Sequence, residues 1–121
     1  MKKIVLISCT LEKLDCKSKV KDLYSPSLNF NKHLDIAKSL SPDKILVISA
    51  KHHVLELEEE IEPYDMSIDK FSGNKQIDWG IEVIKQLKNK KINLEYDEIF
   101  TILPDIYLRL IKPYIKKLKL Y

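Results

Sequence analysis

Residues 3–8 read Lys3-Ile4-Val5-Leu6-Ile7-Ser8, and residues 44–49 repeat the pattern as Lys44-Ile45-Leu46-Val47-Ile48-Ser49. Each stretch is a run of aliphatic residues that begins at a lysine and ends at a serine. Such runs are typical of strands buried on both faces of a parallel sheet. Residues 97–103 have a similar pattern and stop at Pro104. Residues 118–121 fit the start of a fourth strand.

Helical periodicity predicts helices between these strands, over residues 26–40, over residues 75–90 and from residue 104 onward. For the first helix we expect Ser25 as the N-cap and Pro26 at the first position. For the second helix we expect one buried face, made by Ile77, Ile81, Ile84 and Leu87. The alternation of strands and helices predicts a three-layer α/β/α fold with a small, mostly parallel sheet of three to four strands.

The bulk properties restrict the class of protein. A chain of 121 residues fits one domain, and 45% hydrophobic with 32% charged residues excludes disorder and a membrane span. The apolar run before Ser8 is only four residues long, too short for a signal peptide, so we expect a cytoplasmic protein. Cys9 and Cys16 are expected to be reduced, and with the three histidines they form no zinc pattern. Two glycines cannot supply a glycine-rich phosphate loop, so we expect neither a metal nor a cofactor.

The net charge of +3 is small, but the charges are unevenly placed. An acidic stretch is followed by a basic tail without acids; the residues are Glu56, Glu58, Glu59, Glu60 and Glu62, then Arg109, Lys112, Lys116, Lys117 and Lys119. The tail either meets phosphates or forms a solvated lysine-rich surface.

Polar residues follow the first two predicted strands. Ligands of open α/β sheets bind outside the carboxyl ends of the strands, near the point where the strand order reverses. The 51–72 interval is longer than connections in compact domains usually are, which is typical of functional loops. We therefore expect one crevice lined from three segments: Ser8, Cys9, Thr10 and Lys13; then Lys51 and His52; then Glu62, Tyr64 and Asp65.

Each of these residues has a chemical and a structural interpretation. Cys9 is either a nucleophile, activated by Lys51 or His52, or a packed thiol. Lys51 binds a phosphate or pairs with an acid, and His52 is an acid or base or is bonded to backbone.

The acids and the tyrosine of the long loop allow two interpretations as well. Glu62 and Asp65 form a carboxylate pair, or Asp65 caps a turn. Tyr64 stacks on a ring or covers the edge of the core.

Four blocks of the sequence resemble a domain-of-unknown-function family of small bacterial and phage proteins. The blocks are Ser8-Cys9-Thr10 with Lys13, then Val20–Tyr24, then Ile48-Ser49-Ala50-Lys51-His52, then Ile61-Glu62-Pro63-Tyr64-Asp65. The family is similar, more distantly, to peroxide-stress proteins of the YaaA type and to a domain of archaeosine synthase, within a uracil-DNA-glycosylase-like group. The resemblance implies a role related to nucleobases or nucleic acids. Its signature positions are Cys9, Lys13, Lys51, His52, Glu62, Tyr64 and Asp65.

At one position the sequence departs from this family. His53 stands where the family has glycine, so the turn at that point either avoids a positive φ angle or accepts its cost.

Two hypotheses of function follow, and a third is weaker. The first is an enzyme that acts on a nucleoside, nucleotide or nucleic-acid base at the N-glycosidic bond, with Asp65 or Glu62 activating water. The second is a non-catalytic module that binds a nucleotide or nucleic acid through the crevice and the basic tail. The third is a protein-interaction domain that uses the acidic stretch. The sequence leaves the substrate and the oligomeric state open.

Overall fold

The sheet has five strands in the order β4-β3-β1-β6-β7, as seen in a computed structural model that describes residues 1–121. Strands β1 (Lys3–Ser8), β3 (Lys44–Ser49), β6 (Glu98–Ile102) and β7 (Leu118–Leu120) run parallel, and β4 (His53–Glu56) runs antiparallel to β3. The predicted α/β class, with a mostly parallel sheet, is confirmed. The sheet is larger than the three to four strands expected, because β4 was not predicted.

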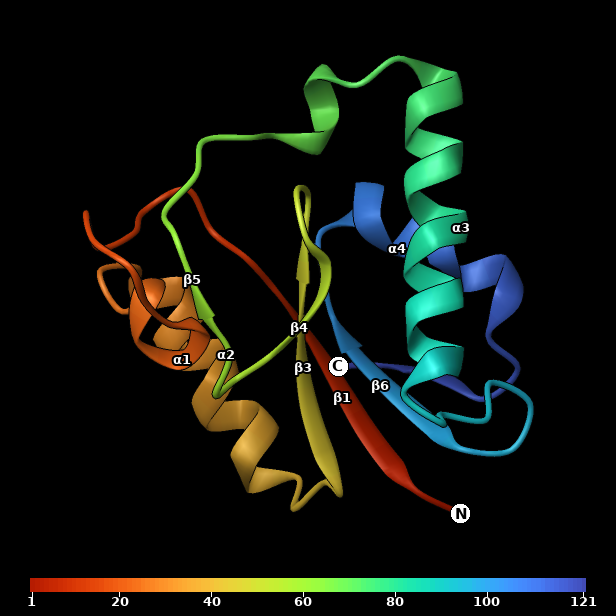
Figure 1. The fold of residues 1–121 in the computed structure, drawn as a ribbon. Helices are drawn as coiled ribbons and strands as arrows, with labels where there is room; N and C mark the ends of the chain where they lie inside the picture. The colour runs from red at the N-terminus through yellow and green to blue at the C-terminus, as the bar shows by residue number, and fades with distance from the viewer.

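Helices cover both faces of the sheet (Figure 1). Helices α1 (Val20–Leu23) and α2 (Leu28–Ser39) lie on one side, and α3 (Gly73–Asn89) and α4 (Asp105–Ile111) lie on the other. A small second sheet pairs β2 (Ser18–Lys19) with β5 (Glu60–Ile61), and two 3₁₀ turns, η1 (Ile68–Lys70) and η2 (Lys112–Tyr114), complete the chain. No helix combines the length and the apolarity that crossing a membrane requires.

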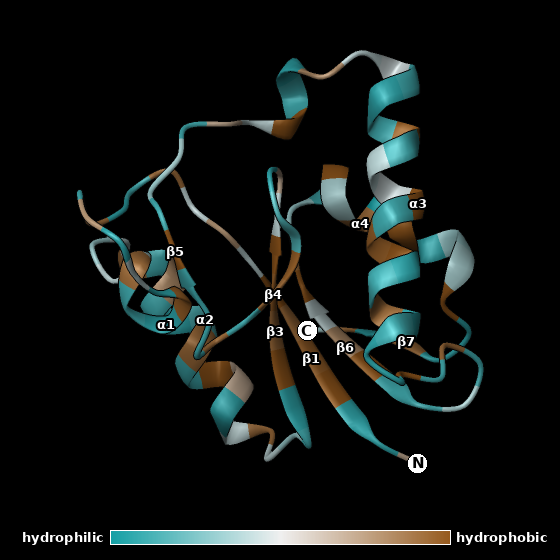
Figure 2. Cartoon of the chain, in the orientation of Figure 1, coloured by the Kyte–Doolittle hydropathy of each residue, from teal (hydrophilic) through white to brown (hydrophobic).

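Strand β1 is the centre of the core. Its alternate residues point to opposite faces, as the pleat of a strand requires. Val5 and Ile7 pack in the cluster under α2, and Ile4 and Leu6 pack in the cluster under α3. All four are essentially inaccessible to solvent. Figure 2 shows the central strands as the continuous apolar layer of the molecule.

The structure corrects the predicted N-cap of α2. Ser27, not Ser25, is the N-cap, since its Oγ accepts the backbone N–H of Phe30 at 3.2 Å. Pro26 lies before the helix and not at its first position. Ser27 directly precedes Leu28, the first residue of the helix, and has an extended backbone, as an N-cap requires, whereas Ser25 lies two residues earlier.

The predicted buried face of α3 is wrong in part. Trp79, Val83, Ile84 and Leu87 are buried, whereas Ile77 and Ile81 are 53% and 49% exposed. The rotation of the helix is fixed by Trp79, whose indole Nε1 donates a hydrogen bond to the carbonyl oxygen of Ser49 at 3.1 Å.

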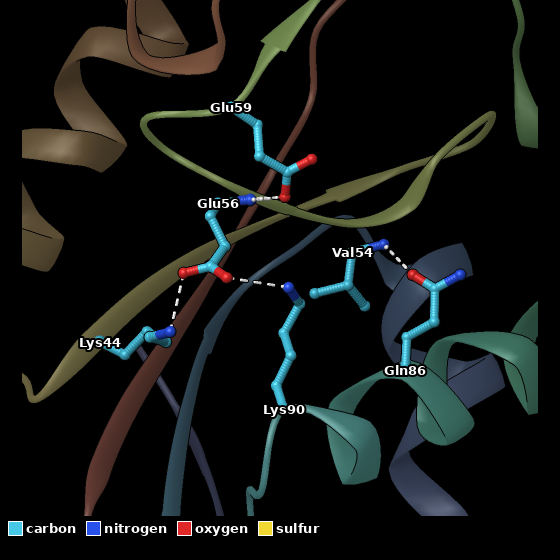
Figure 3. Close-up of polar contacts among 6 residues, drawn as sticks. All are labelled: Lys44, Val54, Glu56, Glu59, Gln86 and Lys90. Carbon is cyan, nitrogen blue, oxygen red and sulfur yellow. Dashed lines mark hydrogen bonds and ion pairs between the residues drawn. The ribbon is translucent and has the colours of Figure 1, made fainter.

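The interval 51–72 is not one long loop but contains β4, β5 and η1. Strand β4 is held by polar contacts from α3 and β3, shown in Figure 3. Glu56 accepts hydrogen bonds from Lys44 at 2.7 Å and from Lys90 at 3.0 Å, and Gln86 Oε1 accepts the backbone N–H of Val54 at 3.1 Å. These two lysines lower the pKa of Glu56.

A second acid of the acidic stretch, Glu58, is also paired with lysines. Glu58 pairs with Lys19 at 3.0 Å and with Lys21 at 2.9 Å. Glu56 and Glu58 each contact two lysines, whereas Glu59, Glu60 and Glu62 are exposed and form no ion pair.

The turn before β4 has a positive φ angle at the position where the resembling family has glycine. His53 has a φ angle of 66°, in the left-handed region that glycine adopts most easily. Its imidazole ring stacks on the indole of Trp79, with ring centroids 6.3 Å apart.

Helices α3 and α4 approach each other closely at Gly80. A Cβ atom at this position would lie 2.7 Å from the carbonyl oxygen of Leu110. Gly80→Ala is therefore expected to lower the free energy of unfolding by about 1–3 kcal/mol in chemical denaturation, although alanine is the better helix former. Gly73→Ala is the matched control, because nothing lies within 4 Å of its Cβ position. Equal effects of the two substitutions would contradict the close packing of the two helices.

Candidate functional site

The carboxyl ends of β1 and β6 open into two hollows that share a wall. Their volumes are about 490 and 360 Å³, and both are lined by Ser8, Cys9, Thr10 and Pro104. After β1 the chain forms β3 next to one edge of β1. It then crosses over and forms β6 next to the other edge of β1, so the strand order reverses at β1. The hollows therefore lie at the position where open α/β sheets bind ligands.

Strand β3 ends beside β1 and supplies the second part of the site. Ser8 pairs with Ile48, and the N–H of Cys9 donates to the carbonyl oxygen of Ile48 at 2.9 Å. The two strands therefore end at the same edge of the sheet, as the sequence analysis predicts for Cys9 and Lys51.

Buried Ser49 organises the turn after β3. Its Oγ accepts the backbone N–H groups of Lys51 at 3.2 Å and of His52 at 3.1 Å. These two amides occupy both lone pairs of the hydroxyl oxygen, so its hydrogen is directed to Tyr64 Oη, 2.7 Å away. Ser49 thus fixes the turn that carries Lys51 and His52 and ties it to the loop that carries Tyr64.

Tyr64 joins this turn to the other side of the sheet. Its hydroxyl lies 2.6 Å from the hydroxyl of Tyr24, which is fully buried at the end of α1. Burial raises the pKa of both tyrosines, so both are neutral phenols near pH 7. The ring of Tyr64 is also the centre around which the charged side chains of the site gather.

Two lysines lie over the ring of Tyr64 and have no acidic partner. The Nζ atoms of Lys13 and Lys51 are 4.6 and 6.0 Å from the ring centroid. Neither Nζ lies within 4.0 Å of a carboxylate, unlike those of Lys19, Lys21, Lys44 and Lys90. Burial lowers the pKa of Lys13, and the nearby charges of Cys9 and Asp65 act in the opposite direction.

Cys9 contacts a tyrosine from the opposite layer. Its Sγ lies 3.5 Å from Tyr107 Oη, which comes from the first turn of α4. Tyr107 is buried against Trp79, with ring centroids 5.2 Å apart, and burial raises the pKa of its hydroxyl. The half-buried thiol of Cys9 therefore has a fixed hydrogen-bonding partner beside the hollows.

His52 lies on the other side of Tyr64. Its ring meets the ring of Tyr64 edge-on, with centroids 5.2 Å apart, and it lines a separate hollow with Glu59, Gln86 and Lys90. Its Nε2 is buried without a hydrogen-bond partner. Burial, and then the charge of Lys51, lower the pKa of His52, so the imidazole is neutral near pH 7.

The two acids predicted for the site are both exposed. Asp65 lies close enough to Lys13 to affect its pKa, but neither Asp65 nor Glu62 makes a hydrogen bond or an ion pair through its side chain within the chain. Thr10 bonds its own loop, donating to the carbonyl oxygen of Glu12 at 3.2 Å. The structure therefore brings Cys9, Lys13, Lys51 and Tyr64 together, and places His52 at the margin.

Some residues of the site were missed by the sequence analysis. Tyr107 had no signal of its own, yet the first turn of a helix that follows a strand faces the same crevice as the strand end. The same reasoning applies to Asp105. Asn29 and His33 line the larger hollow from α2.

The fold and the site define a class: a doubly wound α/β protein with a polar crevice at the reversal of its strand order. Residues 4–120 match a family of unknown function (DUF6884), and the chain belongs to that family. No curated protein and no solved structure matches the chain. Membership in a family of unknown function is thereby confirmed, and the more distant resemblances stay predictions.

The hydroxyl of Tyr64 offers a direct test of the site's framework. Tyr64→Phe removes the link between Ser49 and Tyr24 but keeps the ring that Lys13 contacts. We expect the free energy of unfolding to fall by about 1–2 kcal/mol, because buried hydroxyl groups lose their partner. Tyr96→Phe, at a 55% exposed position, is the control and should change little. Equal losses in the two variants would mean that the hydroxyl network contributes nothing.

Proposed function

We propose that this protein is an enzyme that acts on a nucleoside, nucleotide or nucleic-acid base at the N-glycosidic bond. The observation that carries the proposal is the pair of lysines without an ion-pair partner, Lys13 and Lys51, over the ring of Tyr64, with the free carboxylate of Asp65 near Lys13. The family's distant resemblance to nucleobase-related proteins adds the substrate class. The larger hollow, of about 490 Å³, has room for a nucleoside and is lined by Ser8, Cys9 and Thr10, whereas Lys13, Lys51 and Asp65 lie outside its lining.

Lys13 and Lys51 are assigned to the phosphate or to an electronegative edge of the base. A partly buried ammonium group has lost part of its hydration, and without a counter-ion nothing compensates for this loss. An anionic ligand supplies the missing interaction. Lys13 is the stronger candidate, since it is half-buried and burial lowers its pKa, whereas Lys51 is exposed. Tyr64 is then a positioning residue, because its ring and hydroxyl hold the segments that carry both lysines.

Asp65 is assigned to the reacting water. In this mechanism Asp65 accepts a proton from water while the water oxygen bonds to the anomeric carbon. The carbon–nitrogen bond breaks, its electron pair leaves with the base, the base takes up a proton from solvent, and Asp65 releases its proton to solvent. Glu62 is the second candidate for this role, since it lies on the same loop and is equally free. Cys9 lines both hollows and is the alternative nucleophile.

The test measures, by chromatography, the release of free base from a panel of nucleosides, nucleotides and short oligonucleotides. Asp65→Asn should lower the rate by about 100-fold or more, the usual contribution of a positioned acid or base. Its stability should not change, because Asp65 has no side-chain partner within the chain. Asp35→Asn, an exposed carboxylate on α2, is the matched control. An inactive wild type, or full activity in Asp65→Asn and Glu62→Gln, would refute the proposal.

A second candidate is a non-catalytic module for nucleic acid. It is favoured by the basic tail, whose residues are all exposed and form no ion pair; the residues are Arg109, Lys112, Lys116, Lys117 and Lys119. Binding through this tail releases counter-ions, so the logarithm of affinity should fall with the logarithm of salt by roughly 0.7–0.9 for each phosphate contacted. Steep salt dependence without base release favours the module, and catalysis on free nucleosides with a flat salt response favours the enzyme.

A further inference from the structure

Helix α3 presents an apolar stripe that nothing in the chain covers. Ile77 and Ile81 lie one helical turn apart and are 53% and 49% exposed, and Tyr114 of η2 beside them is 47% exposed. The helix runs along one side of the molecule, and its opposite side packs on α4 and β4 (Figure 1). At about 1.5 Å per residue its 17 residues span about 25 Å, long enough to pack against another helix.

Next to the stripe lies a hollow whose shape fits a side chain from a facing helix. Its volume is about 330 Å³, and its lining includes Ile81, Ile84, Lys85 and Lys88. These four positions have the spacing i, i+3, i+4 and i+7, which is the spacing of the holes that accept knobs in packed helix pairs. Tyr114 closes one side of the hollow. The exposed Ile77, one turn before this hole, is a knob without a hole in its own chain.

The charges along the same face select the orientation of a partner helix. Asp78 lies three positions before Ile81, and Lys85 lies four positions after it, and both are exposed. In an antiparallel pair of α3 helices crossing at Ile81, Asp78 of each copy faces Lys85 of the other. In a parallel pair, like charges would face each other. The face is therefore complementary to itself only in the antiparallel arrangement.

We propose that a second copy of this chain covers the face, through antiparallel packing of the two α3 helices around a two-fold axis near Ile81. Ile77 of each copy enters the hollow of the other, and two Asp78–Lys85 pairs flank the isoleucines. The expected burial of Ile77 and Ile81, which the isolated chain does not provide, is supplied by the dimer. The inference is independent of the proposed function, because this face lies away from the crevice.

The first experiment measures oligomeric state by sedimentation equilibrium of the full chain, up to about 100 μM. The wild type is expected to form a dimer. Ile81→Lys should weaken dimerisation by tenfold or more, while its circular dichroism stays unchanged because the position is half exposed. Leu28→Lys is the matched control, an exposed apolar residue on α2. A monomeric wild type, an assembly larger than a dimer, or equal effects of the two substitutions would overturn the proposal.

The second experiment tests the orientation. Asp78→Lys and Lys85→Asp should each weaken the homodimer by about tenfold or more, because each variant places like charges together. An equimolar mixture of the two variants should form a heterodimer, since every facing pair is then again of opposite charge. The double variant Asp78→Lys/Lys85→Asp should recover the homodimer for the same reason. A mixture no more associated than the separate variants would exclude the antiparallel arrangement.

Discussion

The burial of β1 on both of its faces is the constraint on which the rest of this structure depends. Ile4 and Leu6 contribute to one core cluster while Val5 and Ile7 contribute to the other, so helices must cover both faces of the strand. Hydrogen bonds to β3 and β6 fill both edges. A strand enclosed in this way is accessible only at its two ends, and the polar residues that follow its carboxyl end lie at that edge of the sheet. The site is therefore a consequence of the core.

Much of the fold could be predicted because its signals are local and repeated. The aliphatic runs predicted β1, β3 and β6, and the start of a further strand expected over residues 118–121 is β7, Leu118–Leu120. Strand β4 was missed because four residues carry too little pattern, and because its start needs the positive φ angle of His53. The rotation of α3 was missed because a long-range contact, from Trp79 to the carbonyl oxygen of Ser49, decides it.

The sequence predicted which segments form the site, but not how their side chains are arranged. Strand ends identified Cys9 and Lys51, and the proline-containing loop identified Tyr64 and Asp65. Nothing in the sequence could show that Ser49 directs its hydroxyl to Tyr64, or that Tyr107 reaches Cys9 from another layer. Such contacts depend on how the layers pack, and they separate a positioning residue such as Tyr64 from residues that remain free to meet a ligand.

The hairpin formed by β3 and β4 has a consequence for how the chain folds. Ser49 pairs with His53 across a tight turn, whereas β1 must find β3 and then β6 across long stretches of chain. Because closing a long loop costs more entropy than closing a short one, native pairing begins most easily at this hairpin. The hairpin also contains Ser49. The segment that later organises the crevice is therefore the one that forms with the smallest loss of chain entropy.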